Sequence, residues 1–201
     1  MSRFKTIVAD PPWPYENRYG PRATQEHRPN SWNTACTGSA PRYGAMTMDE
    51  LKGLRVKEVA DNPAHLYLWT TNSFIDRAHD LARTWGFVPK TIVTWGKVKP
   101  DGSPSMKTGY YYRGATEHIL FAVRGVLRLV GEACPTLHLS HRLPHSVKPE
   151  WFYAMVEAHS PGPYLELFAR KTRLGWSTWG DQVPATDISA VLRRVDGDNV
   201  P

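Results

Sequence analysis

An acid followed by two prolines and a tryptophan, Asp10-Pro11-Pro12-Trp13, is the stretch of this sequence best suited to chemistry. It offers a carboxylate that accepts hydrogen bonds, a Pro11 carbonyl kept out of any strand ladder, and a flat indole. Alkylating the exocyclic amine of adenine would need such a set, because that nitrogen is a weak nucleophile. Acceptors must hold its two protons, and a flat surface must hold the base. These four residues are therefore the predicted catalytic group.

The residues before this group predict the element that positions it. Ile7, Val8 and Ala9 form a short apolar run that is typical of a buried strand, and the two prolines end it. Open α/β sheets bind their ligands at the carboxyl ends of strands, so Asp10 is expected at such an end. A strand followed by a proline turn without any chemistry is the alternative.

Strand and helix patterns alternate along the rest of the chain and predict an α/β fold. Helices are expected from Thr47, the start of a capping box, to about Ala60, from Ser73 to Gly86, and from Pro149 to before Ser160. Buried strands are expected over residues 66–71, 90–95, 117–124 and 164–169, with a short strand or turn over 175–179. Residues 66–95 read as a right-handed crossover unit of a parallel sheet. Residues 1–183 are expected to form one domain, with 184–201 as a C-terminal tail.

Three long segments without a clear strand or helix pattern separate these elements, at residues 14–45, 97–116 and 125–148. Compact domains seldom carry such loops without a function. Basic and aromatic side chains are mixed in them, which suits phosphate contacts and stacking on bases. Loops whose aromatic side chains only pack on the body are the alternative. The predicted substrate-binding residues, one of them at a strand end, are Tyr15, Tyr43, Asn72, Lys107, Tyr111 and Arg113.

Composition favours a folded protein with a polyanionic partner. The 201 residues carry a net charge of +6 and a pI near 9.4, which suits nucleic acid without requiring it. Cys36 and Cys134 form no Cys-x-x-Cys pair, and the spacing of Cys134, His138, His141 and His145 matches no zinc finger, so no metal is expected. No signal peptide or membrane span is recognised. A cytoplasmic protein is expected, which works alone, as a homodimer or with a second subunit.

Several ordered blocks of sequence, from about Lys5 to Val183, resemble a known family. Besides Asp10-Pro11-Pro12-Trp13 they are Leu66-Tyr67-Leu68-Trp69-Thr70, Glu117-His118-Ile119-Leu120, His145-Ser146-Val147-Lys148-Pro149, Leu165-Glu166-Leu167-Phe168-Ala169-Arg170, Gly175-Trp176 and Trp179-Gly180-Asp181-Gln182. The sequence is similar to the N6-adenine methyltransferases named after the 70-kDa subunit of mRNA adenosine methyltransferase, the MT-A70 family. The resemblance implies a circularly permuted, Rossmann-like class I methyltransferase sheet with the catalytic strand first, the cofactor strand late, and helices on both faces.

The resemblance also implies S-adenosylmethionine as the methyl donor and adenine N6 in nucleic acid as the acceptor. Lys148 would face the donor's carboxylate, and the other expected cofactor-binding residues are Asp10, Glu166, Leu167, Arg170, Thr172, Asp181 and Gln182. Asp181 stands where family members often carry asparagine, and Thr172 where some carry histidine. Nine residues precede Asp10, so a contact to the cofactor adenine that some members make from an earlier segment must come from elsewhere or be absent.

Three other functions stay open beside methylation of DNA, which we prefer because no separate target-recognition module is visible in the sequence. The substrate could be RNA. The chain could also be a nucleic-acid-binding scaffold that keeps the fold without the activity, although an intact Asp10 argues against this. A nucleotide-dependent oxidoreductase is disfavoured, because the Gly-x-Gly-x-x-Gly pattern is missing.

Overall fold

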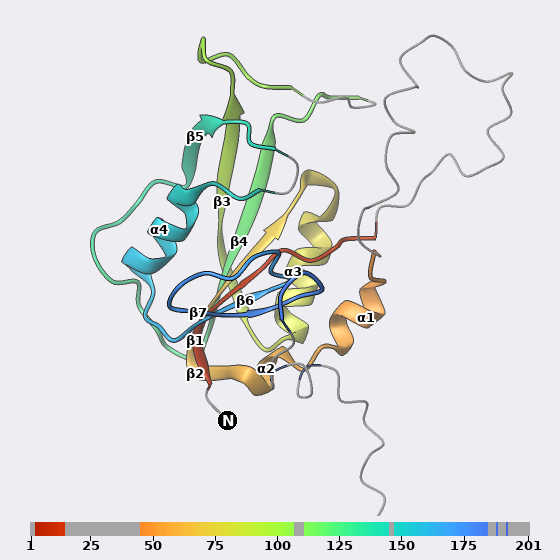
Figure 1. Cartoon of the computed structure of the whole chain (residues 1–201), viewed down its shortest axis with the longest axis vertical. Helices are drawn as coiled ribbons and strands as arrows, with labels where there is room; N and C mark the ends of the chain where they lie inside the picture. The colour runs from red at the N-terminus through yellow and green to blue at the C-terminus, as the bar shows by residue number, and fades with distance from the viewer. Residues whose placement is uncertain are drawn as a thin grey trace, which may run out of the picture.

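A seven-stranded mixed sheet runs through the protein, with helices on both of its faces (Figure 1). The computed structural model describes residues 3–14, 45–106, 111–144 and 147–184, and the single positions 188 and 192. The elements are β1 (Phe4–Ala9), α1 (Met48–Gly53), α2 (Val56–Val59), β2 (Ala60–Thr70), a 3₁₀ turn (Asn72–Phe74), α3 (Ile75–Thr84), β3 (Val88–Val98), β4 (Thr116–Arg124), β5 (Leu137–His141), α4 (Glu150–His159), β6 (Tyr164–Leu167) and β7 (Trp176–Trp179).

The strand order β5-β3-β4-β2-β1-β6-β7 puts the first strand of the chain inside the sheet, beside a late one. Ala9 at the end of β1 pairs with Leu68 of β2 on one side and with Leu167 of β6 on the other, and both pairings are parallel. The first strand and the late strand therefore end side by side. This arrangement confirms the predicted α/β class and the permuted order.

Strand β4 corrects the expectation of a simple parallel crossover. It lies between β2 and β3 and pairs antiparallel with both, so the β2–α3–β3 unit joins parallel strands that are not neighbours. Because β4 is antiparallel to β2 and β3, its first residues lie at the end of the sheet where β1, β2 and β3 finish. A second correction is β5, which pairs parallel with β3 inside the segment 125–148 that was expected to be a loop.

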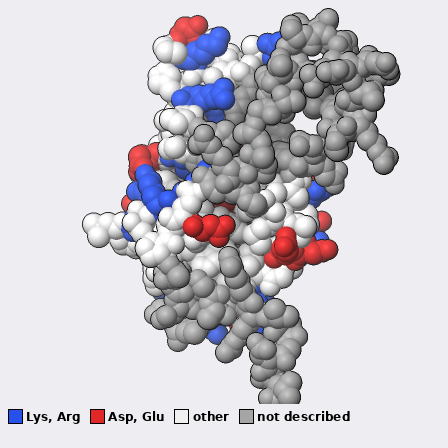
Figure 2. Space-filling model, turned by 45° about the vertical axis from the view of Figure 1, so that its right-hand side comes forward, with Lys and Arg blue, Asp and Glu red and all other residues white. Residues whose placement is uncertain are grey.

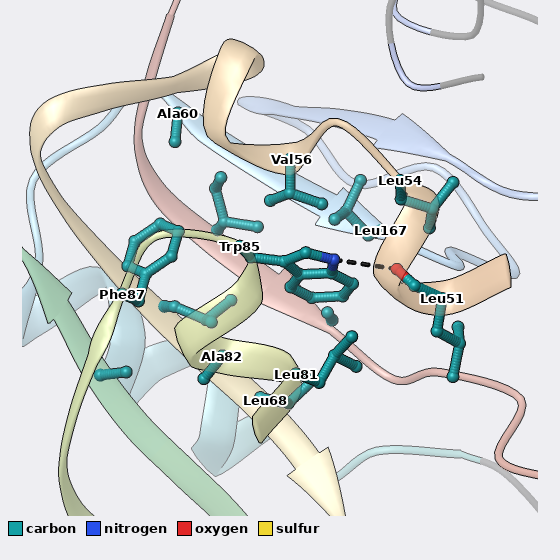
Figure 3. Packing of buried hydrophobic residues seen from close by; sticks show 14 of the residues in the cluster. Leu51, Leu54, Val56, Ala60, Leu68, Leu81, Ala82, Trp85, Phe87 and Leu167 are labelled. Atoms are coloured by element: carbon teal, nitrogen blue, oxygen red, sulfur yellow. Dashed lines mark hydrogen bonds between the residues drawn. The ribbon is translucent and has the colours of Figure 1, made fainter. Parts of the chain in front are cut away.

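Alternation along the strands divides the core between the two faces of the sheet. Ile7 and Ala9 pack with α1, α2 and α3, whereas Val8 between them packs on the other face with α4. Trp85 at the end of α3 ties the helical layer together, since its indole N–H donates to the Leu51 carbonyl at 2.9 Å (Figure 3). Helices thus cover both faces of the sheet, as predicted, and the ends of the strands are left for the site.

The helix boundaries follow the sequence signals with three differences. Thr47 and Glu50 form the expected capping box, but the helix breaks at Leu54, which is extended just after Gly53, so α2 is a separate turn. Glycine is a poor helix former, which accounts for the break. Ser73 lies inside the 3₁₀ turn instead of capping α3, and Pro149 is the residue before α4. Strand β2 also begins earlier than expected, at Ala60 instead of residue 66.

Candidate active site

Asp10 follows the last residue of β1, at the edge of the sheet where β1, β2, β3 and β6 all end. This edge also receives the start of β4, because that strand is antiparallel. It is the position that open α/β sheets use for ligands. Asp10 is half-buried, and its carboxylate forms an ion pair with Lys148, from a distant part of the chain.

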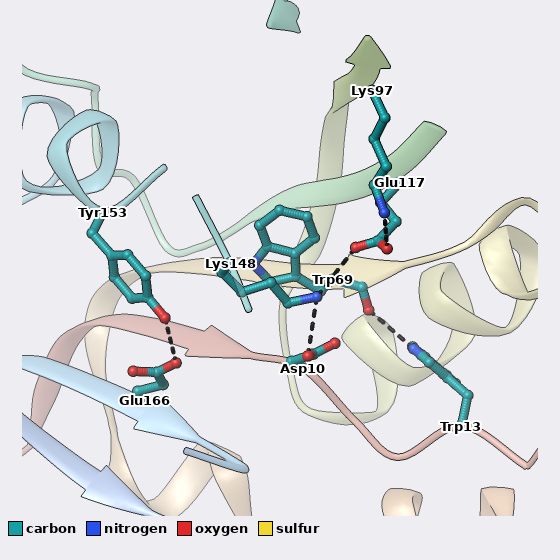
Figure 4. Close-up of polar contacts among 8 residues, drawn as sticks. All are labelled: Asp10, Trp13, Trp69, Lys97, Glu117, Lys148, Tyr153 and Glu166. Carbon is teal, nitrogen blue, oxygen red and sulfur yellow. Dashed lines mark hydrogen bonds and ion pairs between the residues drawn. The ribbon is translucent and has the colours of Figure 1, made fainter. Parts of the chain in front are cut away.

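The ammonium of Lys148 lies at the centre of this cluster (Figure 4). Its Nζ atom is 3.0 Å from Asp10 Oδ2 and 3.4 Å from Glu117 Oε2. It also lies 4.0 Å from the centre of the Trp69 ring, a distance at which the ring face attracts a cation. One lysine therefore bridges the carboxylate that follows β1 and the one near the start of β4. The structure brings together Lys148 and Asp10 as two of the predicted site residues.

Glu117 and Lys97 extend the cluster and were not predicted as site residues. The second oxygen of Glu117, Oε1, accepts a hydrogen bond from Lys97, whose ammonium lies over the Trp95 ring at 4.4 Å. Burial alone would raise the pKa of Glu117, but Lys148 and Lys97 outweigh it and hold that pKa below its usual range. Lys97 was expected in a solvent-exposed loop, but β3 continues to Val98 and buries it.

A second polar group lies on β6. Tyr153 of α4 donates its hydroxyl hydrogen bond to Glu166 Oε1 at 2.8 Å (Figure 4). The guanidinium of Arg173 stacks on the Tyr153 ring, 3.7 Å from its centre. Burial raises the pKa of Glu166, and the negative charge of Asp10 adds to this shift. Arg173 also donates to Glu150, but its buried Nε has no hydrogen-bond partner among the described residues. Tyr153 and Arg173 had no sequence signal, because neither lies in a recognisable motif.

Trp13 is buried and anchors the backbone next to the site. Its indole is 5% exposed, stacks on Phe74 with the ring centres 5.4 Å apart, and donates its N–H to the Trp69 carbonyl at 3.1 Å. These contacts anchor the turn that follows Asp10. Stacking of Trp13 on a base would need an exposed ring face, so that role stays a prediction.

The Pro11 carbonyl was expected to stay out of any strand ladder, and its partner lies within the turn instead. It accepts the backbone N–H of Trp13 at 2.8 Å, which closes a three-residue turn, while the Pro12 carbonyl accepts the N–H of Met46. A carbonyl oxygen has two lone pairs, so Pro11 keeps the capacity for one further hydrogen bond. The turn is thereby fixed at both prolines.

The other predicted cofactor residues lie on two segments that touch each other, after β6 and after β7. The backbone N–H of Ala169 donates to the Trp179 carbonyl at 2.9 Å, and a Cβ on Gly180 would lie 2.3 Å from the Ala169 oxygen. Arg170 is half-buried, and the other members are exposed: Thr172, Asp181 and Gln182. The Leu167 side chain is fully buried in the core, so any contact that it makes with a cofactor would come from its backbone.

The predicted substrate residues are spread more widely. The Oδ1 atom of Asn72 lies 2.5 Å from His118 Nε2, within hydrogen-bond distance, on the face of the sheet opposite Glu117. Tyr111 and Arg113 are exposed, Tyr111 by 96%, and the neighbouring Tyr112 by 93%. Three of the predicted residues lie outside the described part of the chain: Tyr15, Tyr43 and Lys107. In the view of Figure 2, basic and acidic side chains are both present over the described surface, so this side of the molecule is not uniformly basic.

The cysteine and histidine side chains of residues 134–145 were considered above as metal ligands. His138 stacks on Trp151 of α4 at 4.2 Å, and Cys134 is a half-buried free thiol. Among the residues with described positions, no three His, Cys, Asp or Glu side chains gather in a way that could hold a metal ion. Cys36 and His145 lie outside those positions. Within the same residues, every helix is too short or too polar to cross a membrane.

Comparison with known protein families matches residues 4–182 to one family, whose description is MT-A70. The chain belongs to the MT-A70 family. The match spans the whole site, from Asp10 just after β1 to the segment after β7, and it confirms the family expected from the sequence blocks.

Individual relatives carry methyltransferase names. The type II methyltransferase M.MunI of Mycoplasma is 28% identical over 196 residues, which cover 92% of this chain and 80% of that protein. The human N(6)-adenosine-methyltransferase catalytic subunit METTL3 is 25% identical, over 91% of this chain but 29% of its own length. The N6-methyladenosine RNA methyltransferase MTA1 of Cryphonectria parasitica is 28% identical, over 90% of this chain and 52% of its own. These names support the expected class of enzyme, an N6-adenine methyltransferase.

Proposed function

We propose that this MT-A70 family member transfers a methyl group from S-adenosylmethionine to the N6 amine of adenine in a nucleic acid. The observation that carries the proposal is the Asp10 carboxylate at the carboxyl end of β1, which pairs with Lys148 at 3.0 Å. This ion pair places an acceptor for an amine proton beside a cation for an anionic ligand, at the end of the sheet where the strands finish. The names of the relatives support the same reaction.

The side chains around Asp10 fit the methyl donor by their chemistry. Its methionine portion carries a carboxylate and an ammonium, which match the Lys148 ammonium and the carboxylates of Asp10 and Glu166. Arg173 keeps a buried Nε without a hydrogen-bond partner among the described residues, so one more donor is available to an anion. Arg170, Asp181 and Gln182 would hold the ribose. When bound, S-adenosylmethionine supplies an electrophilic methyl group on a positively charged sulfur.

Asp10 and the Pro11 carbonyl would act on the adenine. Each would accept one N–H of the amine and turn the nitrogen lone pair toward the methyl carbon. The donor would supply the methyl group and keep the electron pair of the broken sulfur–carbon bond, while Asp10 and the Pro11 carbonyl would hold the nitrogen that gains the methyl group. The proton lost from nitrogen goes to Asp10 or to water. Fixed position and charge would supply most of the acceleration.

We propose DNA in preference to RNA as the nucleic acid. The support is the alignment with the type II methyltransferase M.MunI, which extends over 80% of that protein, against 52% for the relative named as an RNA methyltransferase. A target adenine in a duplex would have to leave the base stack, which costs least in single-stranded or mismatched sites. The exposed Tyr111 and Tyr112 offer rings on which neighbouring bases could stack.

The test uses labelled S-adenosylmethionine with single-stranded and duplex DNA and RNA, and maps the modified base by mass spectrometry. We expect N6-methyladenine with the wild type. Asp10→Asn should lower turnover by about 10²–10³-fold, the usual loss of one transition-state hydrogen bond. Asp76→Asn, which changes an exposed acid of α3, is the control. Equal turnover by Asp10→Asn and the wild type would refute the proposal, and binding of donor and nucleic acid without methylation would indicate a scaffold.

A further inference from the structure

Lys97 is a buried ammonium that the proposed reaction does not use. The residue is 6% exposed, and no other described lysine, arginine, aspartate or glutamate is as fully buried. Moving an ammonium from water into the protein interior costs on the order of several kcal/mol unless a partner compensates for the lost hydration. Lys97 has two such partners, the Glu117 carboxylate and the face of Trp95. Folding alone does not require a lysine here, because an apolar side chain would fill the same space.

Glu117 connects Lys97 to the centre of the site. Its Oε1 atom contacts Lys97, and its Oε2 atom lies 3.4 Å from Lys148 Nζ. Lys148 in turn lies closer to Asp10, at 3.0 Å. The four side chains form one chain of alternating charges, in which each inner group has two partners. Two ammonium groups balance two carboxylates.

We propose that Lys97 is a positioning residue, which neutralises Glu117 and so leaves the Lys148 ammonium available to Asp10 and to the carboxylate of the methyl donor. The inference rests on the proposed function, because it assigns Lys148 to that carboxylate. Without Lys97, Glu117 would keep a single cationic partner. Lys148 would then be drawn toward Glu117 and would attract a bound anion less.

The burial of Lys97 separates this role from the one expected of a basic loop. A lysine that contacts phosphate must reach solvent, and Lys97 does not. Lys99, two residues later, is exposed and follows the end of β3. The two lysines therefore make a matched pair, since their removal changes the net charge equally but only one of them touches Glu117.

The experiment measures the affinity for S-adenosylmethionine by calorimetry, without nucleic acid, in Lys97→Met, Glu117→Gln, the double variant and Lys99→Met. Lys97→Met should bind about tenfold more weakly, the loss typical of one charge-assisted hydrogen bond. The double variant should return to within about threefold of the wild type, because the neutral amide that replaces the Glu117 carboxylate no longer competes for Lys148. Glu117→Gln alone and Lys99→Met should bind at least as tightly as the wild type.

The rescue separates positioning from a general structural role. A packing defect at Lys97 would persist or worsen in the double variant, which removes both partners of the pair. The inference is overturned if Lys97→Met matches the wild type, if the double variant binds as weakly as Lys97→Met, or if Glu117→Gln alone weakens binding tenfold. The last result is decisive even when Lys97→Met does not fold. A wild type that neither binds S-adenosylmethionine nor methylates adenine overturns the proposed function as well, whereas a wild type that does both leaves it standing.

Discussion

Replacing Lys148 with methionine removes the one cation that Asp10 and Glu117 share. Methionine keeps most of the side-chain volume, so the change is mainly one of charge. Both carboxylates lie within 3.4 Å of the lost ammonium, so they are close enough to repel each other once it is gone. We expect a loss of stability, a loss of donor affinity and a higher pKa of Glu117, which Lys148 now holds down.

The size of the stability loss follows from distance and exposure. At 3.0–3.4 Å, each pair attracts by about 5 kcal/mol in an effective dielectric near 20, and desolvation offsets most of that. The side chains are 11%, 27% and 22% exposed for Lys148, Asp10 and Glu117, between the surface pairs that contribute about 0–1 kcal/mol and the buried pairs whose disruption costs about 3–5 kcal/mol. We therefore expect a decrease of about 2 kcal/mol in the free energy of unfolding, or about 4–8 °C in Tm.

Denaturant unfolding and calorimetry with S-adenosylmethionine test both effects at pH 7.5. Donor affinity should fall by about 10–100-fold, since a hydrogen bond to a charged group contributes about 1.5–3 kcal/mol. Lys90→Met, which removes an exposed lysine from the same sheet, should change neither quantity appreciably. Unchanged donor affinity in Lys148→Met would refute the assignment of Lys148 to the carboxylate, whatever happens to stability. Unchanged stability would show that the ion pairs contribute nothing net.

Two further predictions concern the body of the fold. Burial lowers the pKa of His65, which bonds Ser160 and the Leu127 carbonyl, so the folded protein resists its protonation. The free energy of unfolding should therefore decrease as the pH falls below about 6.5. Denaturant unfolding from pH 8 to 5 should show a smaller decrease for His65→Gln than for the wild type. An equal decrease in the two proteins would show that other groups cause it. Gly180→Ala places a Cβ 2.3 Å from the Ala169 oxygen, which should cost about 1–3 kcal/mol and displace the segments that carry Arg170 and Asp181. Thermal unfolding and donor calorimetry should both detect it, while Gly114→Ala, with open space around it, is the control.

The sequence was sufficient for the elements whose signals are local. The apolar run before Asp10 and the capping box at Thr47 specify a strand end and a helix start through bonds within a few residues. Strand direction has no such signal. Glu117 to Arg124 reads as a buried strand in either direction, and only its pairing with β2 and β3 shows that it is antiparallel. The short strand β5 has alternating exposure at the edge of the sheet and lies among loop residues, so its pattern was too weak.

The direction of β4 also explains why half of the charged cluster was missed. In a parallel sheet Glu117, at the start of its strand, would lie at the edge opposite Asp10. The antiparallel strand brings it beside Lys148 instead. Lys97 was read as part of a basic loop because nothing in its neighbours shows that β3 continues past it. Its burial depends on Trp95 and on Glu117, which lies twenty residues further along the chain.

The energetic cost of this cluster argues that its residues are there for the chemistry. Partly buried ion pairs contribute little net stability, because the loss of hydration offsets most of their attraction. Four charged groups at the end of a largely apolar sheet are therefore a poor way to stabilise the fold. They are a good way to hold one ammonium and one carboxylate in fixed positions while excluding water that would screen them. With Lys97 bound to Glu117, the ion pair of Lys148 and Asp10 can be exchanged for bonds to an anionic ligand and to an amine.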